Sequence, residues 1–289
     1  MFPVETFTTS MLRASVLLSV WVATPVLAQL PSASAQPTVP SADEIVQKCD
    51  TKYAGDDQWT TMTVVNRNKD GAERKAVYKR MVKNYAGQAG PVSQKMILVT
   101  EFPPSERDFA FMRVEYLPDA DKVPEQWLYA PDSKALRRVA ERDPTLSFLG
   151  STLTLGDITQ RAADHDTHRL IGVDRSFSGE AWLIESVPKK ADPQYSKRIS
   201  RFTKTPSWDT CVKEQIVYYD RKGIKLKVQD IKWQQVDGAW LWSHVDVVNT
   251  QDQRASVFDI TDVRINTQLE EGLFTDRTLK RGLKGLPKR

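Results

Sequence analysis

Hydrophobic and polar residues alternate along most of this chain. Ile224, Leu226 and Val228 alternate with polar residues, which is typical of a half-buried β-strand. Asp237-Gly238, a strong hairpin signal, separates two further segments of this kind. The same reasoning predicts strands at 58–67, 74–82, 94–101, 108–116, 126–130, 135–139, 169–172, 181–187, 196–205, 212–219, 224–229, 231–236, 239–248 and 254–265. The sequence therefore predicts a mainly β protein.

Helical patterns are few and short. Ser41 and Glu44 have the spacing of a capping box and predict a helix from Ser41 to about Tyr53. Its apolar stripe is Ile45, Cys49 and Tyr53, and Gly55 follows as a stop signal. Two further short helices are expected at 155–163 and 275–281, and a Gly-containing loop at 86–91.

One predicted strand is apolar on both faces, with the sequence Met96-Ile97-Leu98-Val99. A strand in an antiparallel sheet commonly packs one face on the core and exposes the other face to solvent. The second face here needs a cover, either helices or a bound apolar ligand. Because helices are scarce, a curved sheet with a few helices inside it would satisfy this pattern.

The stretch from Gln126 to Asp157 combines a hairpin with an unusual loop. Pro131, Asp132 and Ser133 provide turn chemistry between two short apolar segments. The loop that follows contains Phe148, Leu149, Leu153 and Leu155 among Gly, Ser and Thr. Loops are usually polar, so this one is expected to contact either the core or an apolar ligand.

This stretch resembles the LolA-like family of outer-membrane lipoprotein-sorting proteins. The matching residues include Trp127-Leu128-Tyr129, Pro131, Arg137-Arg138, Phe148-Leu149-Gly150-Ser151 and Asp157; Thr152, Leu153 and Thr154 depart from the family pattern. The C-terminal third is also similar, through Asp237-Gly238-Ala239-Trp240, Asp259-Ile260-Thr261-Asp262 and Leu273-Phe274-Thr275. The resemblance implies one domain at 41–283, followed by a tail at 284–289. Its fold would be a curved antiparallel sheet forming an open half-barrel, with short helices covering the concave face.

The N-terminus has the features of a secretory signal peptide. Arg13 precedes an apolar run at 14–28, and small-x-small sites end at Ala28 and Ala35. We therefore expect a signal peptide at 1–35, cleaved near residue 28 or 35, and a flexible leader at 36–40. Translation starting at Met11 would preserve the signal. The alternative is a single anchoring helix, but the apolar run is short. Export to the periplasm is the expectation.

Two cysteines, Cys49 and Cys211, are present. In an oxidising compartment they could form a disulfide that ties the N-terminal helix to the sheet. Two separate buried thiols are the alternative, because sequence does not give the Cα distance that a disulfide requires.

Candidate catalytic chemistry is sparse. His165 and His168 are spaced three apart, but a zinc site needs a third protein ligand, and His244 lies on a predicted strand. A polar loop is the simpler interpretation. Phosphate-binding and nucleophile-elbow motifs are absent. The net charge is +4, and we expect the basic residues to be spread through the strands, with no nucleic-acid-binding motif. We therefore expect no enzyme, metal, cofactor or nucleic-acid partner.

Aromatic residues are the remaining lead, since the chain has eight Trp. Most lie on predicted strands and, with several Met, could line an adaptable apolar cavity or simply pack in the core. Arg137 and Arg138 are candidates for binding a head group, or a solvated face of the sheet. The Trp and Met in question are Trp59, Trp127, Trp182, Trp233, Trp240, Trp242, Met62, Met81, Met96 and Met112. The predicted ligand contacts are Trp127, Tyr129, Phe148, Leu149, Leu153, Met96, Leu98, Phe111 and Trp182.

The family resemblance implies a periplasmic carrier for lipids or for the acyl chains of lipoproteins. Burial of each methylene contributes roughly 0.8 kcal/mol, so an apolar groove would retain a chain strongly. Partners would then be an inner-membrane transporter and an outer-membrane acceptor. The alternative is a non-enzymatic module that docks on an envelope transporter complex, with its cavity filled by its own side chains. An open cavity would favour the carrier, and a collapsed one the module.

Overall fold

A computed structural model of the chain describes residues 39–140, 143–177 and 179–287. Residues from Pro40 onward form one compact unit. The predicted signal peptide at 1–35 and the first three residues of the predicted leader at 36–40 lie outside the described residues.

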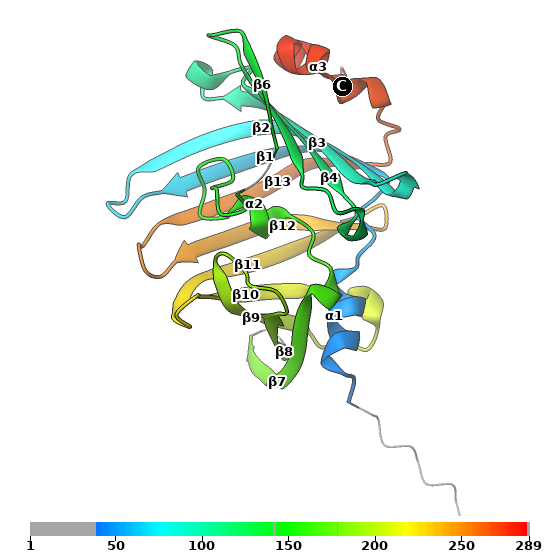
Figure 1. The fold of residues 1–289 in the computed structure, drawn as a ribbon, viewed down its shortest axis with the longest axis vertical. Coiled ribbons are helices and arrows are strands. Elements are labelled where there is room, and N and C mark those ends of the chain that lie inside the picture. Colours follow the sequence, from blue (N-terminus) through cyan, green and yellow to red (C-terminus); the bar gives the residue numbers. More distant parts are fainter. Residues whose placement is uncertain (1–38, 141–142, 178, 288–289) are drawn as a thin grey trace, which may run out of the picture. The chain divides into compact units, whose positions relative to one another are not determined.

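The unit is built on one antiparallel sheet (Figure 1). Its order is β6-β5-β4-β3-β2-β1-β13-β12-β11-β10-β9-β8-β7, so the two ends of the meander meet in the middle, where β1 pairs with β13. The thirteen strands are β1 (Asp57–Arg67), β2 (Glu73–Ala89), β3 (Val92–Phe102), β4 (Ala110–Tyr116), β5 (Glu125–Ala130), β6 (Ala135–Ala140), β7 (Asp166–Phe177), β8 (Gly179–Pro188), β9 (Tyr195–Thr203), β10 (Lys213–Asp220), β11 (Lys225–Val236), β12 (Ala239–Asn249) and β13 (Ala255–Ile265).

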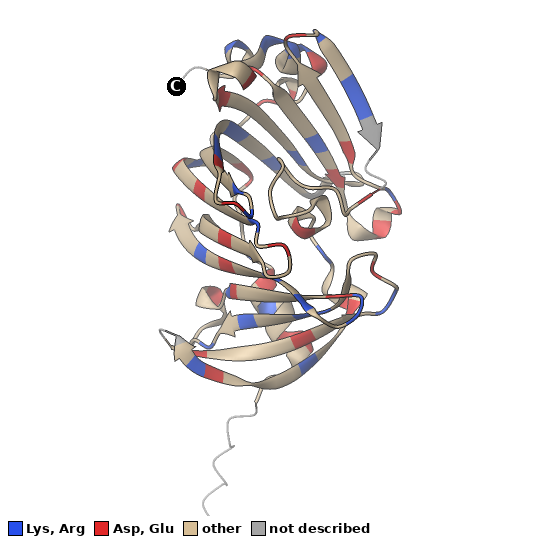
Figure 2. Cartoon of the chain, turned by 90° about the vertical axis from the view of Figure 1, so that its left-hand side faces the viewer, with Lys and Arg blue, Asp and Glu red and all other residues tan. Residues whose placement is uncertain are grey.

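The sheet is curved and open. Strands β6 and β7 lie at its two edges and do not pair with each other, and Figure 2 shows the sheet bending around a concave face. Cross-strand neighbours such as Val64 and Phe258, or Met62 and Ile260, point to this concave face and form its core. The predicted mainly β, half-barrel fold is confirmed.

The unusual apolar loop is explained by this topology. Because β6 and β7 lie at opposite edges, the chain between them must cross a face of the sheet, and it crosses the concave one. Phe148, Leu153 and Leu155 on this crossing segment (143–165) are buried in the concave core. Helix α2 (Leu155–Ile158) is part of this crossing segment and is shorter than the predicted helix at 155–163.

The N-terminal helix also packs on the concave side. Helix α1 (Ala42–Asp50) begins at Ser41, whose side chain accepts a hydrogen bond from the Glu44 amide. Ile45 and Cys49 are buried against strands β8 and β9, as the stripe predicted. The third predicted stripe residue, Tyr53, is half exposed, because the helix ends three residues earlier.

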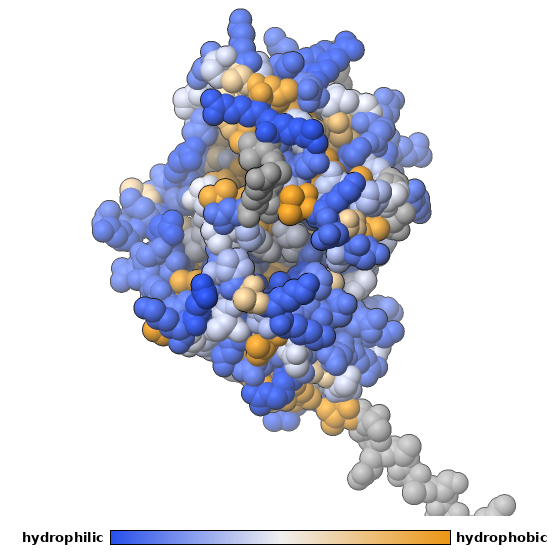
Figure 3. Space-filling view, in the orientation of Figure 1, coloured by the Kyte–Doolittle hydropathy of each residue, from blue (hydrophilic) through white to orange (hydrophobic). Residues whose placement is uncertain are grey.

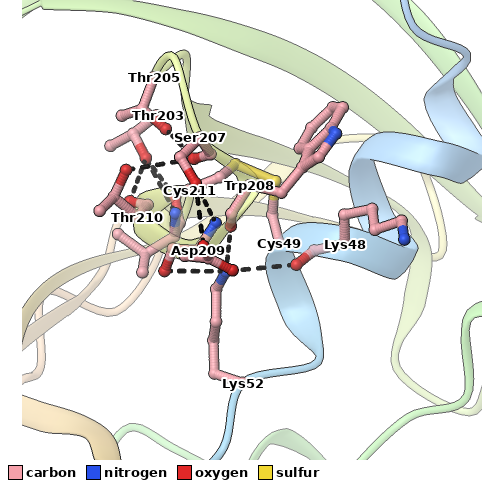
Figure 4. Close-up of a disulfide and its surroundings, with 11 residues drawn as sticks. Lys48, Cys49, Lys52, Thr203, Thr205, Ser207, Trp208, Asp209, Thr210 and Cys211 are labelled. Atoms are coloured by element: carbon pink, nitrogen blue, oxygen red, sulfur yellow. Dashed lines mark hydrogen bonds between the residues drawn. A yellow bond between two sulfur atoms is a disulfide. The ribbon is translucent and has the colours of Figure 1, made fainter. Parts of the chain in front are cut away.

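The two cysteines form a disulfide between α1 and the loop before β10. The Cα atoms of Cys49 and Cys211 are 5.0 Å apart, although 162 positions separate them in sequence. Lys52 donates to main-chain carbonyls of Trp208 and Asp209 beside it (Figure 4). The bond therefore fixes the start of the unit to the C-terminal half of the sheet.

The two apolar faces of β3 have separate covers. Met96 and Leu98 point into the concave core, whereas Ile97 and Val99 lie on the opposite, convex face. Helix α3 (Asp276–Arg281) and the 3₁₀ turn η6 (Gly282–Gly285) cover the convex face, with Leu273, Leu279 and Leu286 buried there. The second cover is thus the chain's own C-terminus. Helices α1 and α2 lie on the concave face as predicted, and α3 does not.

Further segments differ in extent from what the sequence predicted. Strand β2 continues to Ala89 and pairs with Val92, so most of the expected loop at 86–91 is strand. At the expected tail, 284–289, η6 extends to Gly285 and Leu286 is buried in the convex cluster.

Candidate functional site: a cavity on the concave face

A cavity of about 1210 Å³ lies on the concave side of the sheet. Its walls are α1 with the segment that follows it, the crossing segment from Gly156 to Ala163, and the concave faces of β9 to β12. Ligand pockets in proteins are roughly 300–1,000 Å³, so this one is large enough for a sizeable ligand.

One wall of the cavity is aromatic. It contains Trp233, Trp240 and Trp242 from the β11–β12 hairpin, with Ile216 of β10. The rings of Trp233 and Trp242 meet edge to face, with centroids 6.5 Å apart. The Trp233 indole donates to the main-chain carbonyl of Lys213, at 2.7 Å, which fixes its orientation. These side chains are partly buried and offer apolar surface to an occupant.

Another part of the lining is polar and includes Glu115 and Thr159, which are both partners of Arg113, a residue that does not itself line the cavity. Arg113 is almost fully buried, forms an ion pair with Glu115, and donates to the Thr159 hydroxyl at 2.7 Å. Arg80 donates to Gln58 nearby, at 2.8 Å. Burial lowers the pKa of Arg80 to about 10, although the charge of Glu115 opposes the shift. The lining of the cavity is therefore amphipathic, since it includes Glu115 and other charged residues as well as tryptophans.

A buried ion pair anchors the crossing segment to the sheet. Asp157 of α2 pairs with Lys227 of β11, and Asp157 also accepts from the Tyr195 hydroxyl at 2.8 Å and from the Thr154 amide at 2.7 Å. Burial lowers the pKa of Lys227, and the charge of Asp157 opposes this shift. The ammonium group also lies over the ring of Tyr218, at 4.7 Å from its centroid.

A second charged cluster lies in the lining of the cavity. Arg161, on the crossing segment, makes two hydrogen bonds to Asp166, at 2.8 and 2.6 Å. Arg198 of β9 donates to Asp192 at 2.9 Å and stacks over the Tyr195 ring. Arg161, Asp166 and Arg198 all line the cavity. The crossing segment is therefore held by two polar anchors, Asp157 within α2 and Arg161 after it.

The nine predicted ligand contacts lie in three clusters, and none of them lines this cavity. Most are in the closed concave core: Met96, Leu98, Phe111, Phe148 and Leu153 are buried there, with Leu149 packed against them. Trp127 and Tyr129 belong to the convex cluster under α3, and Trp182 packs against α1. Their role in ligand binding remains a prediction.

The cavity tryptophans were in the broader aromatic set but not among the predicted contacts. The sequence feature that could have brought them together is the Asp237-Gly238 turn, because it places Trp233, Trp240 and Trp242 on two paired strands. Sequence alone did not show that this hairpin faces the space left beside the crossing segment.

The two candidate head-group arginines lie on opposite faces of the edge strand. Arg137 is opposite Leu128, whose side chain packs in the concave core, and Arg138 is opposite Trp127 on the convex side. Arg138 pairs with Glu125 and stacks over the Trp127 ring, at 5.2 Å from its centroid. Both side chains are exposed and neither lines the cavity.

Two of the three histidines, His168 and His244, have hydrogen-bond partners within the protein. His168 hydrogen-bonds to Ser186 and to the main chain of Ala163, both at 2.8 Å. His244 lies between Asp259 and Asp246, at 2.6 and 2.7 Å. Among the described residues, no group of three His, Cys, Asp or Glu could hold a metal ion.

The surface seen in Figure 3 is mainly hydrophilic, with hydrophobic residues scattered over it. No helix in the described ranges is both long enough and apolar enough to span a bilayer.

The chain matches one family model and is similar to several solved structures. A family model that is described only as an uncharacterized protein matches residues 92–281. No curated protein matches the chain. A DUF1329 family protein from Desulfovibrio piger is similar in structure, with a TM-score of 0.72 and 20% identity over 82% of this chain and 97% of that one.

Two further solved structures share the fold. A putative outer membrane lipoprotein-sorting protein domain from Vibrio parahaemolyticus has a TM-score of 0.69 and 21% identity, covering 83% of this chain and 98% of that chain. A LolA superfamily protein from Nitrosomonas europaea has a TM-score of 0.59 and 16% identity, covering 83% and 99%. The chain therefore belongs to the family whose model matches residues 92–281, and its fold is the LolA-like fold of the outer membrane lipoprotein-sorting proteins.

Proposed function

We propose that the protein is a non-enzymatic periplasmic carrier that holds lipids, or the acyl chains of lipoproteins, in the concave cavity. The observation that carries this proposal is the cavity of about 1210 Å³ with a tryptophan wall. Each methylene that leaves water for such a wall contributes about 0.8 kcal/mol, so a long chain is held without any covalent chemistry.

The amphipathic lining suits an amphiphilic cargo. Acyl carbons would contact Ile216, Trp233 and Trp242, and a polar head group would face the Glu115 and Thr159 side. Release would need a partner, which we propose to be an outer-membrane acceptor, with an inner-membrane transporter supplying the cargo. The fold shared with a lipoprotein-sorting protein domain supports this assignment.

The predicted ligand contacts in the concave core would reach the cargo only after a movement of the crossing segment. Phe148, Leu149 and Leu153 lie on the crossing segment, and the core beneath them is closed. They would reach an acyl chain only if this segment moved away from the sheet. The Lys227–Asp157 pair opposes that movement, so ligand contact at these residues would imply that the pair breaks on loading.

The test begins with protein exported to a bacterial periplasm and purified without detergent. Native mass spectrometry and lipid extraction should find a stoichiometric lipid. A clean apo mass, together with failure to bind a fluorescent fatty acid, would overturn the carrier proposal. A docking module for an envelope transporter would then be the better explanation.

Site variants locate the binding. Trp242→Ala should weaken fatty-acid binding about five- to tenfold, because losing roughly 50 Å² of apolar contact at about 25 cal/mol per Å² costs about 1.3 kcal/mol. Trp127→Ala is the matched control, since Trp127 packs on the convex side. A loss with Trp127→Ala and none with Trp242→Ala would place the ligand elsewhere.

A further inference from the structure

The C-terminal cover of the convex face carries a dense basic surface. Between Asp276 and Gly285 the exposed charged residues are four cations, Arg277, Lys280, Arg281 and Lys284, and one anion, Asp276. Their neighbours Thr278, Leu279 and Gly282 are buried. We call these four cations the α3 basic surface.

The cations of this surface lack partners within the part of the chain that the structure describes. No carboxylate there forms a salt bridge with any of the four, although most exposed arginines elsewhere have one, such as Arg67 with Glu73. The loop at Arg107 and Asp108 offers little negative charge to compensate the four cations. Asp108 is occupied by the Leu283 amide, which donates to it at 2.7 Å, and Arg107 beside it adds an exposed positive charge.

The segment that carries the α3 basic surface is held in place by packing and by a helix cap. Leu279 and Leu286 are buried in the convex cluster, and Thr275 caps α3 by accepting from the Thr278 amide. Gly282, at φ +56°, brings its backbone so close to Asp108 that a Cβ atom would lie 2.4 Å from Oδ1. The four cations are therefore held together by packing. This arrangement needs a physical reason, because like charges repel.

We propose that the α3 basic surface docks the protein on an anionic phospholipid membrane. The partner must be negatively charged, because the surface has an excess of three positive charges over ten residues. A membrane fits better than an acidic protein, because neither α3 nor η6 lines the concave cavity, where a protein side chain could insert. Long, flexible Lys and Arg side chains suit a fluid layer of head groups, which attracts each nearby cation.

Docking here leaves the cargo site free. Helix α3 covers the convex face, whereas the cavity is on the concave face of the same sheet. Neither α3 nor η6 contributes a large exposed hydrophobic residue. The contact is therefore electrostatic, without insertion, and should weaken as salt shortens the Debye length from about 10 Å at 0.1 M to about 3 Å at 1 M.

Vesicle co-sedimentation of the exported, purified protein tests this proposal. Binding should be detected with phosphatidylcholine vesicles containing phosphatidylglycerol, be absent with phosphatidylcholine alone, and be lost at 1 M salt. The variant Arg277→Gln/Lys280→Gln/Arg281→Gln/Lys284→Gln should bind at least about tenfold more weakly.

The control removes the same charge elsewhere. Lys69, Arg221, Lys222 and Lys225 are exposed at hairpin ends, and Lys69→Gln/Arg221→Gln/Lys222→Gln/Lys225→Gln should retain most of the binding. Equal losses in both variants would reduce the effect to net charge and overturn the proposal, as would the absence of binding to anionic vesicles. If the first variant does not fold by circular dichroism, Lys280→Gln/Lys284→Gln replaces it. The result is independent of whether lipid is found in the cavity.

Discussion

Lys227 on β11 and Asp157 on α2 form an ion pair that is almost completely buried, with 3% and 1% of their side chains exposed. The two residues are 70 positions apart in sequence. Their pairing fixes the crossing segment to the middle of the concave face, beside the cavity.

Removing one member of this pair should strongly destabilise the protein. Lys227→Met leaves the Asp157 carboxylate buried without its cation, which typically costs about 3–5 kcal/mol. The free energy of unfolding from urea titration measures the loss. Arg67→Met is the control, because the Arg67–Glu73 pair is exposed and should contribute about 0–1 kcal/mol. A Lys227→Met loss as small as the control's would show that the pair does not anchor the segment.

Phe148 should carry much of the packing of the crossing segment. Its ring stacks on Phe258, at 6.4 Å between centroids, and meets Phe111 edge to face at 6.3 Å. Phe148→Ala should cost about 3–5 kcal/mol of unfolding free energy, through lost transfer energy and a cavity. Leu146→Ala, on the same segment but 57% exposed, should change it by less than about 0.5 kcal/mol. Similar values for the two variants would contradict the burial described here.

The disulfide should stabilise the unit considerably. It closes a loop spanning 162 positions, and restricting such a loop in the unfolded chain is worth about 3–5 kcal/mol. Cys49→Ala/Cys211→Ala should lower the guanidinium midpoint accordingly and speed amide exchange in α1. Reductant should affect the wild type and leave the double variant unchanged. A wild type that is equally stable with and without reductant would refute this expectation.

His244 should give the protein a specific pH dependence. Its pKa is raised, mainly by the hydrogen bond to Asp259 and also by Asp246, although partial burial opposes this. The raised folded-state pKa means that the protonated ring stabilises the native state. This contribution is complete below the unfolded-state pKa and is lost as pH rises through the folded-state pKa.

An NMR titration of His244 measures this pKa directly. Asp259→Asn should lower it more than Asp246→Asn, because the Asp259 bond is the larger cause. His244→Gln should flatten the fall in stability between mildly acidic and mildly alkaline pH. An unchanged pKa in both Asn variants would mean that the two carboxylates do not hold the proton.

The sequence by itself determined the β-strands and most of the turns, and the family resemblance implied the open-sheet fold. Local chemistry controls these features: the Asp237-Gly238 turn, the alternation at Ile224–Val228 and the Ser41 cap act within a few residues. It also indicated that Met96-Ile97-Leu98-Val99 needs two covers. The apolar loop at Phe148 and Leu153 was recognised as unusual for the same local reason.

Only the tertiary structure decided which residues line the cavity. Both covers of β3 come from distant parts of the chain, the crossing segment and the C-terminal turn after α3. Whether Phe148 meets ligand or core depends on how a connection between opposite sheet edges crosses the concave face. The same holds for Cys49 with Cys211 and for Lys227 with Asp157, because burial and charge pairing depend on distances in space that alternation along a chain does not encode.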